Sequence, residues 1–312
     1  QGLGVDALGV NCSLGPKELM PIVEEISKWT TVPIVVKANA GLPDPVTNTY
    51  NVLPDEFADT CKEMVKYGAK VLGGCCGTTP AYVAKLKEMV ATVNASVVKK
   101  KPRQLAVCTP LKTVVVDQPR IVGERINPTG KKRFKQALRD NDMNYILSQA
   151  IEQIDAGADI LDVNVGSPDI DEKEMMVKVI KALQAIVDVP LQIDSTKPEV
   201  LEAALRVYNG KPIVNSVNGE EEVLDTILPI VAKYGGAVIG LALDENGIPP
   251  TAEGRVEIAK RIRDKAMSYG IPKEDIIIDC LTLTVSAEQK AAAETLKAMN
   301  IVKNELGLRT VL

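Results

Sequence analysis

Histidine is absent from this 312-residue sequence, and so are long apolar runs and a strong net charge. Without histidine, any metal site in the chain must use sulfur or oxygen ligands. No apolar run reaches about 18 residues and no charged-then-apolar leader is present, so we expect neither a spanning helix nor a signal peptide. The net charge of −4, from 37 basic and 41 acidic residues, gives no broad attraction to nucleic acid or to an anionic membrane. We therefore expect a cytoplasmic protein without nucleic-acid or membrane partners.

Six cysteines are present, two of them adjacent, and their arrangement does not look like a disulfide framework. In a reducing cytosol, metal binding or catalysis is the commoner use of such cysteines. An apolar fraction of 46% is ample for buried cores around them.

Short β-branched runs alternate with amphipathic helical patterns along the chain, which is typical of parallel βαβ units. Residues 98–118 interrupt this alternation with a basic run and two prolines, and we interpret them as a linker in which 113–116 could form a short strand. Before the linker, strand patterns lie at 6–11, 33–39 and 70–74. After it, they lie at 121–124, 159–163, 191–193, 213–215, 238–243 and 276–279, and a seventh begins at Thr310.

These patterns predict an α/β protein built from two (β/α)8 barrels of the TIM type. Such a barrel takes about 250 residues. Residues 1–97 would then hold only the C-terminal strands of the first barrel, and residues 119–312 a second barrel that lacks its last strand. Gln1 in place of Met agrees with a chain that starts inside a domain. The alternative is a doubly wound sheet, but Gly123-Glu124-Arg125 is not the glycine-rich turn that this fold wants after its first strand.

Three cysteines stand directly after strand patterns: Cys12 after the first, and Cys75 and Cys76 after the third. Because parallel barrel strands end at one rim, the three thiolates can converge there. Catalytic zinc usually takes three protein ligands and keeps a fourth position open. Asn39 ends the middle strand and either supplies that fourth ligand in the absence of substrate or only makes a turn. The alternatives for the cysteines are inert buried thiols or a strained disulfide between neighbours.

The segments 9–16, 36–41 and 73–79 resemble the homocysteine methyltransferase family. This resemblance implies a Zn²⁺ site held by Cys12, Cys75 and Cys76 that receives homocysteine. Zinc removes the proton of a bound thiol near neutral pH, so the substrate sulfur becomes a nucleophile. The other three cysteines, Cys61, Cys108 and Cys280, lack a comparable cluster.

Three polar residues of the second part stand where apolar strand patterns stop: Asp194, Asn215 and Asp279. A single Asp at such a position is often a helix cap or a turn former. In one barrel, however, all three would point into one mouth. The 2-amino-4-oxo edge of a pterin offers adjacent N–H donors to a carboxylate and ring nitrogens to an amide, which two Asp and one Asn match. Glu124, Asp162 and Asn164 occupy comparable positions.

The segments 123–127, 162–164, 193–196 and 215–216 resemble the pterin-binding barrel family, which includes dihydropteroate synthase and corrinoid methyltransferases. The resemblance implies that Asp194, Asn215 and Asp279 hold the pterin, with Glu124 and Asn164 as further candidates. The family has another Asn in its last βα loop, and this sequence ends before that loop.

Both families, joined in this order, resemble the N-terminal half of the cobalamin-dependent methionine synthase family. The resemblance implies a methyltransferase that moves a methyl group from 5-methyltetrahydrofolate, via cobalamin, to zinc-activated homocysteine, forming methionine and tetrahydrofolate. A module absent from this chain would bind cobalamin, in the same protein or in a separate subunit, because that family's cobalamin ligand is a His. The alternatives are a corrinoid-dependent methyltransferase, a dihydropteroate synthase-like pterin enzyme, or a non-catalytic subunit that binds folate or zinc.

Overall fold

The computed structural model describes residues 5–93, 103–283 and 289–312. The chain divides into two compact units, Leu3–Arg103 and Gln104–Leu312, which we describe separately. The opening residues 1–4 and the basic run of the expected linker, residues 99–102, lie outside the described residues. Within the described parts of the chain, no helix is long and apolar enough to cross a membrane.

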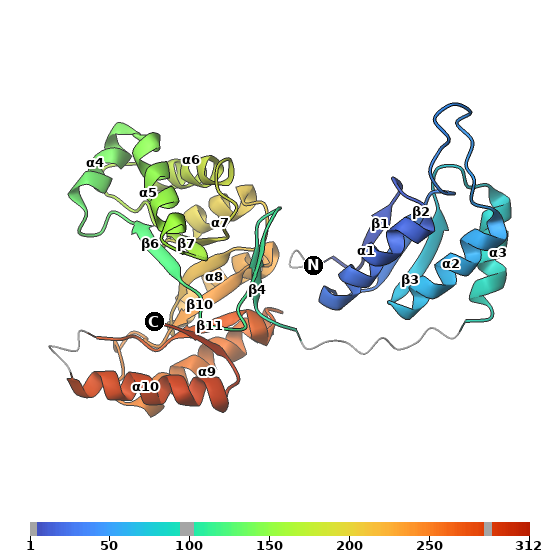
Figure 1. The fold of residues 1–312 in the computed structure, drawn as a ribbon. Helices are drawn as coiled ribbons and strands as arrows, with labels where there is room; N and C mark the ends of the chain where they lie inside the picture. Colours follow the sequence, from blue (N-terminus) through green and yellow to red (C-terminus); the bar gives the residue numbers. More distant parts are fainter. Residues whose placement is uncertain (1–4, 94–102, 284–288) are drawn as a thin grey trace. The chain divides into compact units, whose positions relative to one another are not determined.

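The first unit is a three-stranded parallel sheet in the order β1-β2-β3 (Figure 1). Each strand is followed by a helix with Pro at its start, a position where the missing N–H costs no hydrogen bond. The three expected strands are therefore present. The elements are β1 (Leu8–Asn11), α1 (Pro16–Trp29), β2 (Ile34–Ala38), α2 (Pro54–Lys66), β3 (Ala69–Gly74) and α3 (Pro80–Val90).

One face of this sheet is packed against helices. Ile34, Val36 and Ala38 of β2 are buried and join Phe57 and Met64 of α2 in one apolar core. Strand residues that alternate with them point to the other face, because successive side chains of a strand point to opposite sides.

The second unit is a curled sheet of seven parallel strands in the order β12-β11-β10-β9-β8-β7-β6, with helices outside it (Figure 1). All seven strand patterns read from the sequence correspond to strands of this sheet. The strands are β6 (Val122–Ile126), β7 (Ile160–Val163), β8 (Leu191–Asp194), β9 (Ile213–Val217), β10 (Ala237–Leu241), β11 (Ile276–Asp279) and β12 (Arg309–Val311). The helices are α4 (Lys132–Asp140), α5 (Met143–Asp155), α6 (Glu172–Gln184), α7 (Pro198–Val207), α8 (Glu221–Tyr234), α9 (Ala252–Ser268) and α10 (Gln289–Asn304), with a 3-10 turn at Lys273–Asp275.

Apolar side chains cover both faces of this sheet, as expected for parallel strands. The large cluster between strands and helices includes Leu191 and Ile193 of β8. A smaller cluster on the inner face includes Ile160, Ile213 and Ile277. The inner face is thus apolar near the start of the strands and becomes polar toward their carboxyl ends.

The expected linker is only partly a linker, which corrects the boundary drawn from the sequence. Its second half forms an antiparallel hairpin of β4 (Ala106–Cys108) and β5 (Thr113–Val115) that belongs to the second unit. Leu105, Val107 and Val114 of this segment are buried in the inner apolar cluster. Cys108 also exchanges backbone hydrogen bonds with Lys211. The prolines suggested a loop, whereas the apolar residues between them pack on the inner face of the sheet near the amino-terminal ends of its strands.

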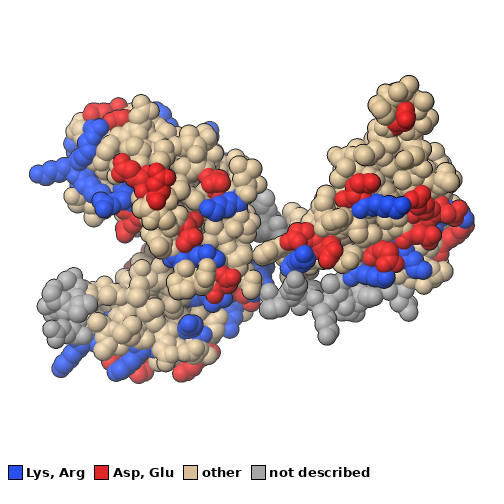
Figure 2. All heavy atoms as spheres, viewed as in Figure 1, with Lys and Arg blue, Asp and Glu red and all other residues tan. Residues whose placement is uncertain are grey.

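Charged side chains of both signs cover the helices of the first unit on the face shown in Figure 2. Lys17 pairs with Glu56 and Lys85 with Asp55, all on exposed side chains. Exposed pairs of this kind contribute at most about 1 kcal/mol. The apolar cluster of the first unit therefore contributes more to its stability than these ion pairs do.

Burial of the hairpin predicts that Leu105→Ala destabilises the second unit by about 2–5 kcal/mol, because it removes a buried side chain and leaves a cavity. Leu111, at the exposed tip of the same hairpin, is the matched control, and Leu111→Ala should change stability by no more than about 0.5 kcal/mol. Urea unfolding of both variants checks this. Equal stabilities would show that the hairpin is not part of the core.

Candidate functional site

The structure brings the three strand-end cysteines of the first unit together. Cys12 follows β1, and Cys75 and Cys76 follow β3, so both groups lie at the same edge of the sheet. Their sulfur atoms all lie within 4.8 Å of one another. The Sγ atoms of Cys12 and Cys76 are 3.6 Å apart. Such a cluster of thiols could hold a soft metal ion.

The backbone at Cys12 is strained in a way that serves this cluster. Cys12 and Ser13 both have left-handed conformations, with φ of 65° and 63°. For residues other than glycine, this costs on the order of 1 kcal/mol or more each. The turn is held by the Leu14 N–H, which donates to the Cys12 carbonyl at 2.7 Å. It directs the chain back over the end of β2 and leaves the Cys12 thiol at the sheet edge.

Asn39 and Tyr50 complete the surroundings of the sulfur atoms. Asn39, only 4% exposed, accepts a hydrogen bond from the Cys76 N–H through Oδ1 at 3.0 Å. The Tyr50 ring packs against Gly77, where an added Cβ would come within 2.2 Å of the ring. Desolvation, followed by the negative charge of a Cys76 thiolate, raises the pKa of Tyr50. Sequence reasoning singled out Asn39 but missed Tyr50, which lies in a loop with no periodic signal.

Different causes set the thiol pKa values of the clustered cysteines and of the buried Cys61. The Ser13 backbone N–H, and then the thiols of Cys76 and Cys75, lower the pKa of Cys12, so that its thiolate is favoured. Hydrogen bonding to Cys12 and Cys75 raises the pKa of Cys76, because the cluster resists a second negative charge. Burial alone raises the pKa of Cys61 to about 12. Within the cluster the pKa of Cys12 is thus lowered, whereas the buried Cys61 thiol stays protonated in the core.

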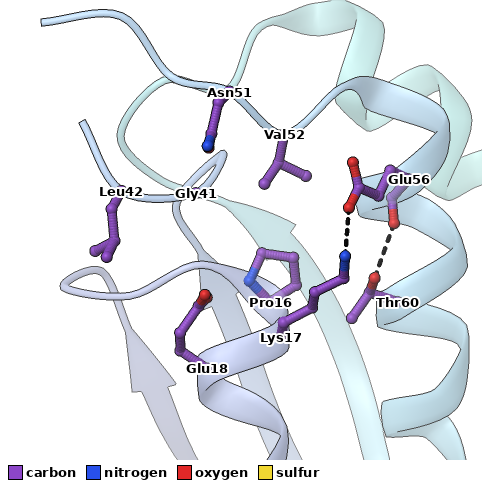
Figure 3. A pocket seen from close by; sticks show the side chains of 9 residues that line it. All are labelled: Pro16, Lys17, Glu18, Gly41, Leu42, Asn51, Val52, Glu56 and Thr60. Atoms are coloured by element: carbon purple, nitrogen blue, oxygen red, sulfur yellow. Dashed lines mark hydrogen bonds and ion pairs between the residues drawn. The ribbon is translucent and has the colours of Figure 1, made fainter. Parts of the chain in front are cut away.

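A pocket of about 220 Å³ lies beside the cluster's loops, at the start of α1 and α2 (Figure 3). The Lys17 ammonium and the Glu56 carboxylate, 2.6 Å apart, cross its wall. Gly41 has a φ of 95° and lies against the Asn51 side chain. A Cβ at position 41 would come within 2.4 Å of Asn51 Oδ1. The pocket contains none of the three cysteines, and its full lining is Pro16, Lys17, Glu18, Gly41, Leu42, Asn51, Val52, Glu56 and Thr60.

In the second unit, Asp194, Asn215 and Asp279 stand on the inner face near the carboxyl ends of β8, β9 and β11. Asp194 is paired with Asn215 in the strand register, so their side chains are neighbours. Asp194 Oδ2 accepts from Asn164 Nδ2 at 2.8 Å, and Asp279 Oδ1 accepts from the Leu281 N–H at 2.7 Å. All three side chains are partly buried.

The two further candidates lie in different surroundings. Asn164 is part of the same network through its bond to Asp194. Glu124 is exposed on an irregular stretch of β6, where its Oε1 accepts from Asn127 Nδ2 at 3.3 Å. Its charge still raises the pKa values of Asp162 and Asp194. Glu124 is therefore at the margin of the acidic cluster.

A buried polar pair, Asp162 and Gln192, lies beneath these residues. Asp162 is 1% exposed, and its Oδ1 accepts from Gln192 Nε2 at 2.6 Å and from Asn215 Nδ2 at 3.2 Å. Sequence reasoning noted Asp162 only as another strand-end residue and missed Gln192. The available signal was the spacing of two between Gln192 and Asp194, which places both on one face of an apolar strand.

Burial dominates the electrostatics of this acidic cluster. It raises the pKa of Asp194, against the hydrogen bond from Asn164, and it raises the pKa of Asp279, against the bond from the Leu281 N–H. Burial, followed by the charge on Asp194, raises the pKa of Asp162 to about 7. Burial thus favours the neutral form of each of these acids.

Comparison with known proteins agrees with this arrangement. Residues 123–312, more than half of the chain, match the pterin binding enzyme family. The chain belongs to the pterin binding enzyme family. Residues 1–90 match a second family, homocysteine S-methyltransferase, so the cysteine cluster and the acidic cluster of this pterin binding enzyme lie in separately matched segments.

Relatives of this pterin binding enzyme include two methionine synthases. Those of Mycobacterium leprae and Mycobacterium tuberculosis are each 33% identical over 96% of the chain. The chain spans only about a quarter of their length, 27% and 26%. The methionine synthase resemblance read from the motifs is thereby confirmed. Among solved structures, dihydropteroate synthase from Xanthomonas albilineans with 4-aminobenzoic acid matches with a TM-score of 0.51 at 21% identity, over 66% of this chain and 75% of that one. This match shows the fold alone.

The raised pKa of Asp162 predicts a pH dependence of stability that Asp162→Asn removes. An unfolded Asp has a pKa near 3.9. Between that value and about 7, the folded state binds more protons than the unfolded state, so its stability falls as the pH rises through this range. The difference between the two pKa values corresponds to a loss of at most about 4 kcal/mol in the free energy of unfolding.

Urea unfolding at pH 5 and pH 8 should therefore show a smaller loss of stability for Asp162→Asn than for the parent chain. Asp188→Asn, at an exposed carboxylate just before β8, is the charge-matched control and should keep the parent's pH dependence. If Asp162→Asn and Asp188→Asn behave alike, Asp162 is not the group responsible.

Proposed function

We propose that this chain provides the homocysteine and folate sites of a cobalamin-dependent methionine synthase. In this proposal a methyl group passes from 5-methyltetrahydrofolate, via cobalamin, to zinc-activated homocysteine, giving methionine and tetrahydrofolate. The observation that carries it is the convergence of three thiols at one strand edge, in the segment that matches homocysteine S-methyltransferases. An acidic, donor-poor cluster in the segment that matches pterin binding enzymes accompanies it.

The spacing of the sulfur atoms supports zinc. Tetrahedral zinc with bonds of about 2.3 Å sets its sulfur ligands about 3.8 Å apart, and the Sγ atoms of Cys12 and Cys76 are 3.6 Å apart. Asn39 would be the fourth ligand until substrate arrives, because its Oδ1 keeps a lone pair beside the bond from the Cys76 N–H. When bound, Zn²⁺ would keep the homocysteine sulfur deprotonated and nucleophilic. Cys12, with its lowered pKa, would be the first thiol to bind as a thiolate.

The acceptor atoms of the second unit support a pterin. Within the described residues, Asp194 Oδ1, Asn215 Oδ1 and Asp279 Oδ2 have no protein donor, although another atom of each side chain is hydrogen-bonded. Three acceptors on one face suit the amino and ring N–H groups of a reduced pterin. Asp194, Asn215 and Asp279 would bind and orient the ring, with Asn164 fixing Asp194 and Glu124 at the margin.

The arrangement of the strands fits a larger assembly. We propose that the three-stranded sheet is the C-terminal part of one TIM-type barrel and the seven-stranded sheet most of a second. Cobalamin would be held by a further module, in the same protein or in a separate subunit. The thiols require a reducing compartment, for which the cytoplasm is the natural choice.

The zinc proposal predicts one Zn²⁺ per chain after purification under reducing conditions. Cys75→Ser should weaken zinc binding by more than about a hundredfold, because even residues that only support a ligand contribute tenfold to a hundredfold. Competition with a chromogenic chelator measures the affinity. Cys108→Ser, in the hairpin of the other unit, is the control and should leave zinc binding unchanged.

Asn39→Ala refines the same measurement. It should weaken zinc binding about tenfold without homocysteine and have no effect at saturating homocysteine, whose sulfur takes the fourth position. If Cys75→Ser binds zinc as tightly as the parent chain does, the cysteine cluster is not the zinc site. An Asn39→Ala variant with parental affinity under both conditions would exclude only the fourth ligand.

The pterin proposal predicts that Asp279→Ala weakens 5-methyltetrahydrofolate binding about tenfold to a hundredfold. One charge-assisted hydrogen bond contributes about 1.5–3 kcal/mol. Calorimetric titration measures the affinity, and the zinc content serves as the internal control because the cysteines lie in the other unit. A folded Asp279→Ala variant that binds like the parent would remove Asp279 from the site.

A further inference from the structure

We propose that Asp162 is a positioning residue of the pterin site: it holds the Asn215 amide in one orientation, so that Oδ1 and the second N–H of Asn215 face the ring. This inference rests on the proposed pterin-binding function. Asp162 lies beneath the rim, since the strand register pairs it with Gln192, two residues before Asp194. It would therefore act on the ligand through Asn215 rather than by touching it.

Asp162 acts toward Asn215 as a hydrogen-bond acceptor. Asp162 Oδ1 accepts from Gln192 Nε2 at 2.6 Å and from Asn215 Nδ2 at 3.2 Å. The Gln192 amide, on the strand between them, keeps the carboxyl in place. Asp162 Oδ2 and Gln192 Oε1 are buried without a hydrogen-bond partner among the described residues. One oxygen of Asp162 thus carries both contacts, and it carries them as an acceptor.

An acceptor at this place decides which way Asn215 points. The two ends of an Asn amide have almost the same shape, and only hydrogen bonding distinguishes its two orientations. With Nδ2 toward Asp162, one N–H is bonded. In the flipped orientation two oxygens would face each other in a buried site, and the Asn215 oxygen would have no donor there. The flipped state is therefore disfavoured.

The orientation matters because of the ligand's chemistry. The outer edge of Asn215 presents an acceptor next to a donor. In a pterin the 2-amino group is a donor and the adjacent ring N1 an acceptor, so the two edges are complementary. A 2,4-dioxo analogue of the same shape, a lumazine, reverses the pattern: it has a carbonyl at position 2 and an N–H at N1. Asp162 would thus give the site its preference for the 2-amino ring.

The test is a set of substitutions at Asp162, each titrated with 5-methyltetrahydrofolate, tetrahydropterin and tetrahydrolumazine in the absence of oxygen. Asp162→Leu removes the acceptor at similar size. We expect it to weaken methyltetrahydrofolate binding about tenfold and to reduce the preference for tetrahydropterin by a similar factor. Asp162→Asn keeps a carbonyl oxygen for both bonds, so we expect it to restore the affinity to within about threefold of the parent. Asp188→Leu, at an exposed site before β8, is the control for the loss of a carboxylate and should change neither value.

A double-mutant cycle shows whether Asp162 acts through Asn215. In an Asn215→Ala background, Asp162→Leu should change the affinity by less than about twofold, since the amide that it orients is gone. A tenfold loss in that background would overturn the proposal, and so would parental affinity of Asp162→Leu. Equal losses in Asp162→Leu and Asp162→Asn would overturn it as well, because the charge rather than the acceptor would then be required.

A second measurement uses the unmodified chain and does not depend on how Asp162→Leu folds. In a ¹⁵N-Asn-labelled sample, the side-chain amide of Asn215 is assigned by its absence from Asn215→Ala. One of its two protons should exchange with water at least about tenfold more slowly than the other, because only one is bonded to Asp162. Equal exchange of the two protons would contradict the inference. Failure of the unmodified chain to bind methyltetrahydrofolate would instead overturn the pterin function, and this inference with it.

Discussion

The parallel register of the strands is the constraint on which both clusters depend. In a parallel sheet the carboxyl ends of all strands lie at one edge, and residues spaced by two share a face. Pairing of Asp162 with Gln192 and of Asp194 with Asn215 therefore stacks two polar pairs on the inner face. A slip of β8 by one residue would turn Gln192 and Asp194 toward the helices. The buried Leu191 and Ile193, packed against those helices, prevent such a slip.

Both clusters also depend on strained backbone just beyond a strand. In the first unit the left-handed Cys12 and Ser13 follow β1, and in the second the left-handed Leu281 follows β11, two residues after Asp279. Residues other than glycine adopt this conformation only where the surroundings enforce it. At Leu281 the enforcement comes from Arg255, a buried side chain whose Nη1 donates to the carbonyls of Cys280 and Leu281 at 2.8 and 3.0 Å. An arginine of α9 thus holds the loop that carries the Leu281 N–H to Asp279.

The two clusters differ in exposure and in electrostatics: the acids of the second unit are partly or fully buried, whereas the cysteine cluster is partly exposed. Burial raises the pKa of Asp162, Asp194 and Asp279 and so favours the neutral form of each acid. At the thiol cluster, the Ser13 N–H and the neighbouring thiols lower the pKa of Cys12 instead. The two clusters thus differ in what sets the pKa of their acidic groups: burial at the carboxyl groups, and hydrogen bonding at Cys12.

Local patterns in the sequence were sufficient for the strands of the two parallel sheets and for the order of their βα units, and they singled out the three cysteines and the strand-end acids, but not Tyr50 or Gln192. Strand periodicity and helix starts are local properties, and a polar residue at the end of an apolar run is visible without a structure, as at Cys12, Asp194 and Asp279. The resemblance to known families then assigned the chemistry. The hairpin of β4 and β5 was only half visible, because its prolines are a local signal whereas the burial of Leu105 and Val107 depends on distant strands.

Tertiary structure alone decided which atoms meet. The spacing of 63 residues between Cys12 and Cys75 says nothing of sulfur atoms within 4.8 Å, which follow from the order β1-β2-β3. Likewise, no pattern in the chain reveals that Asp162 bonds Asn215 across the strand that carries Gln192, or that Tyr50 covers Gly77 beside Cys76. Hydrogen bonds and pKa shifts depend on distances of a few ångströms between residues far apart in the chain. Those distances exist only once the sheet has curled and its inner face is packed.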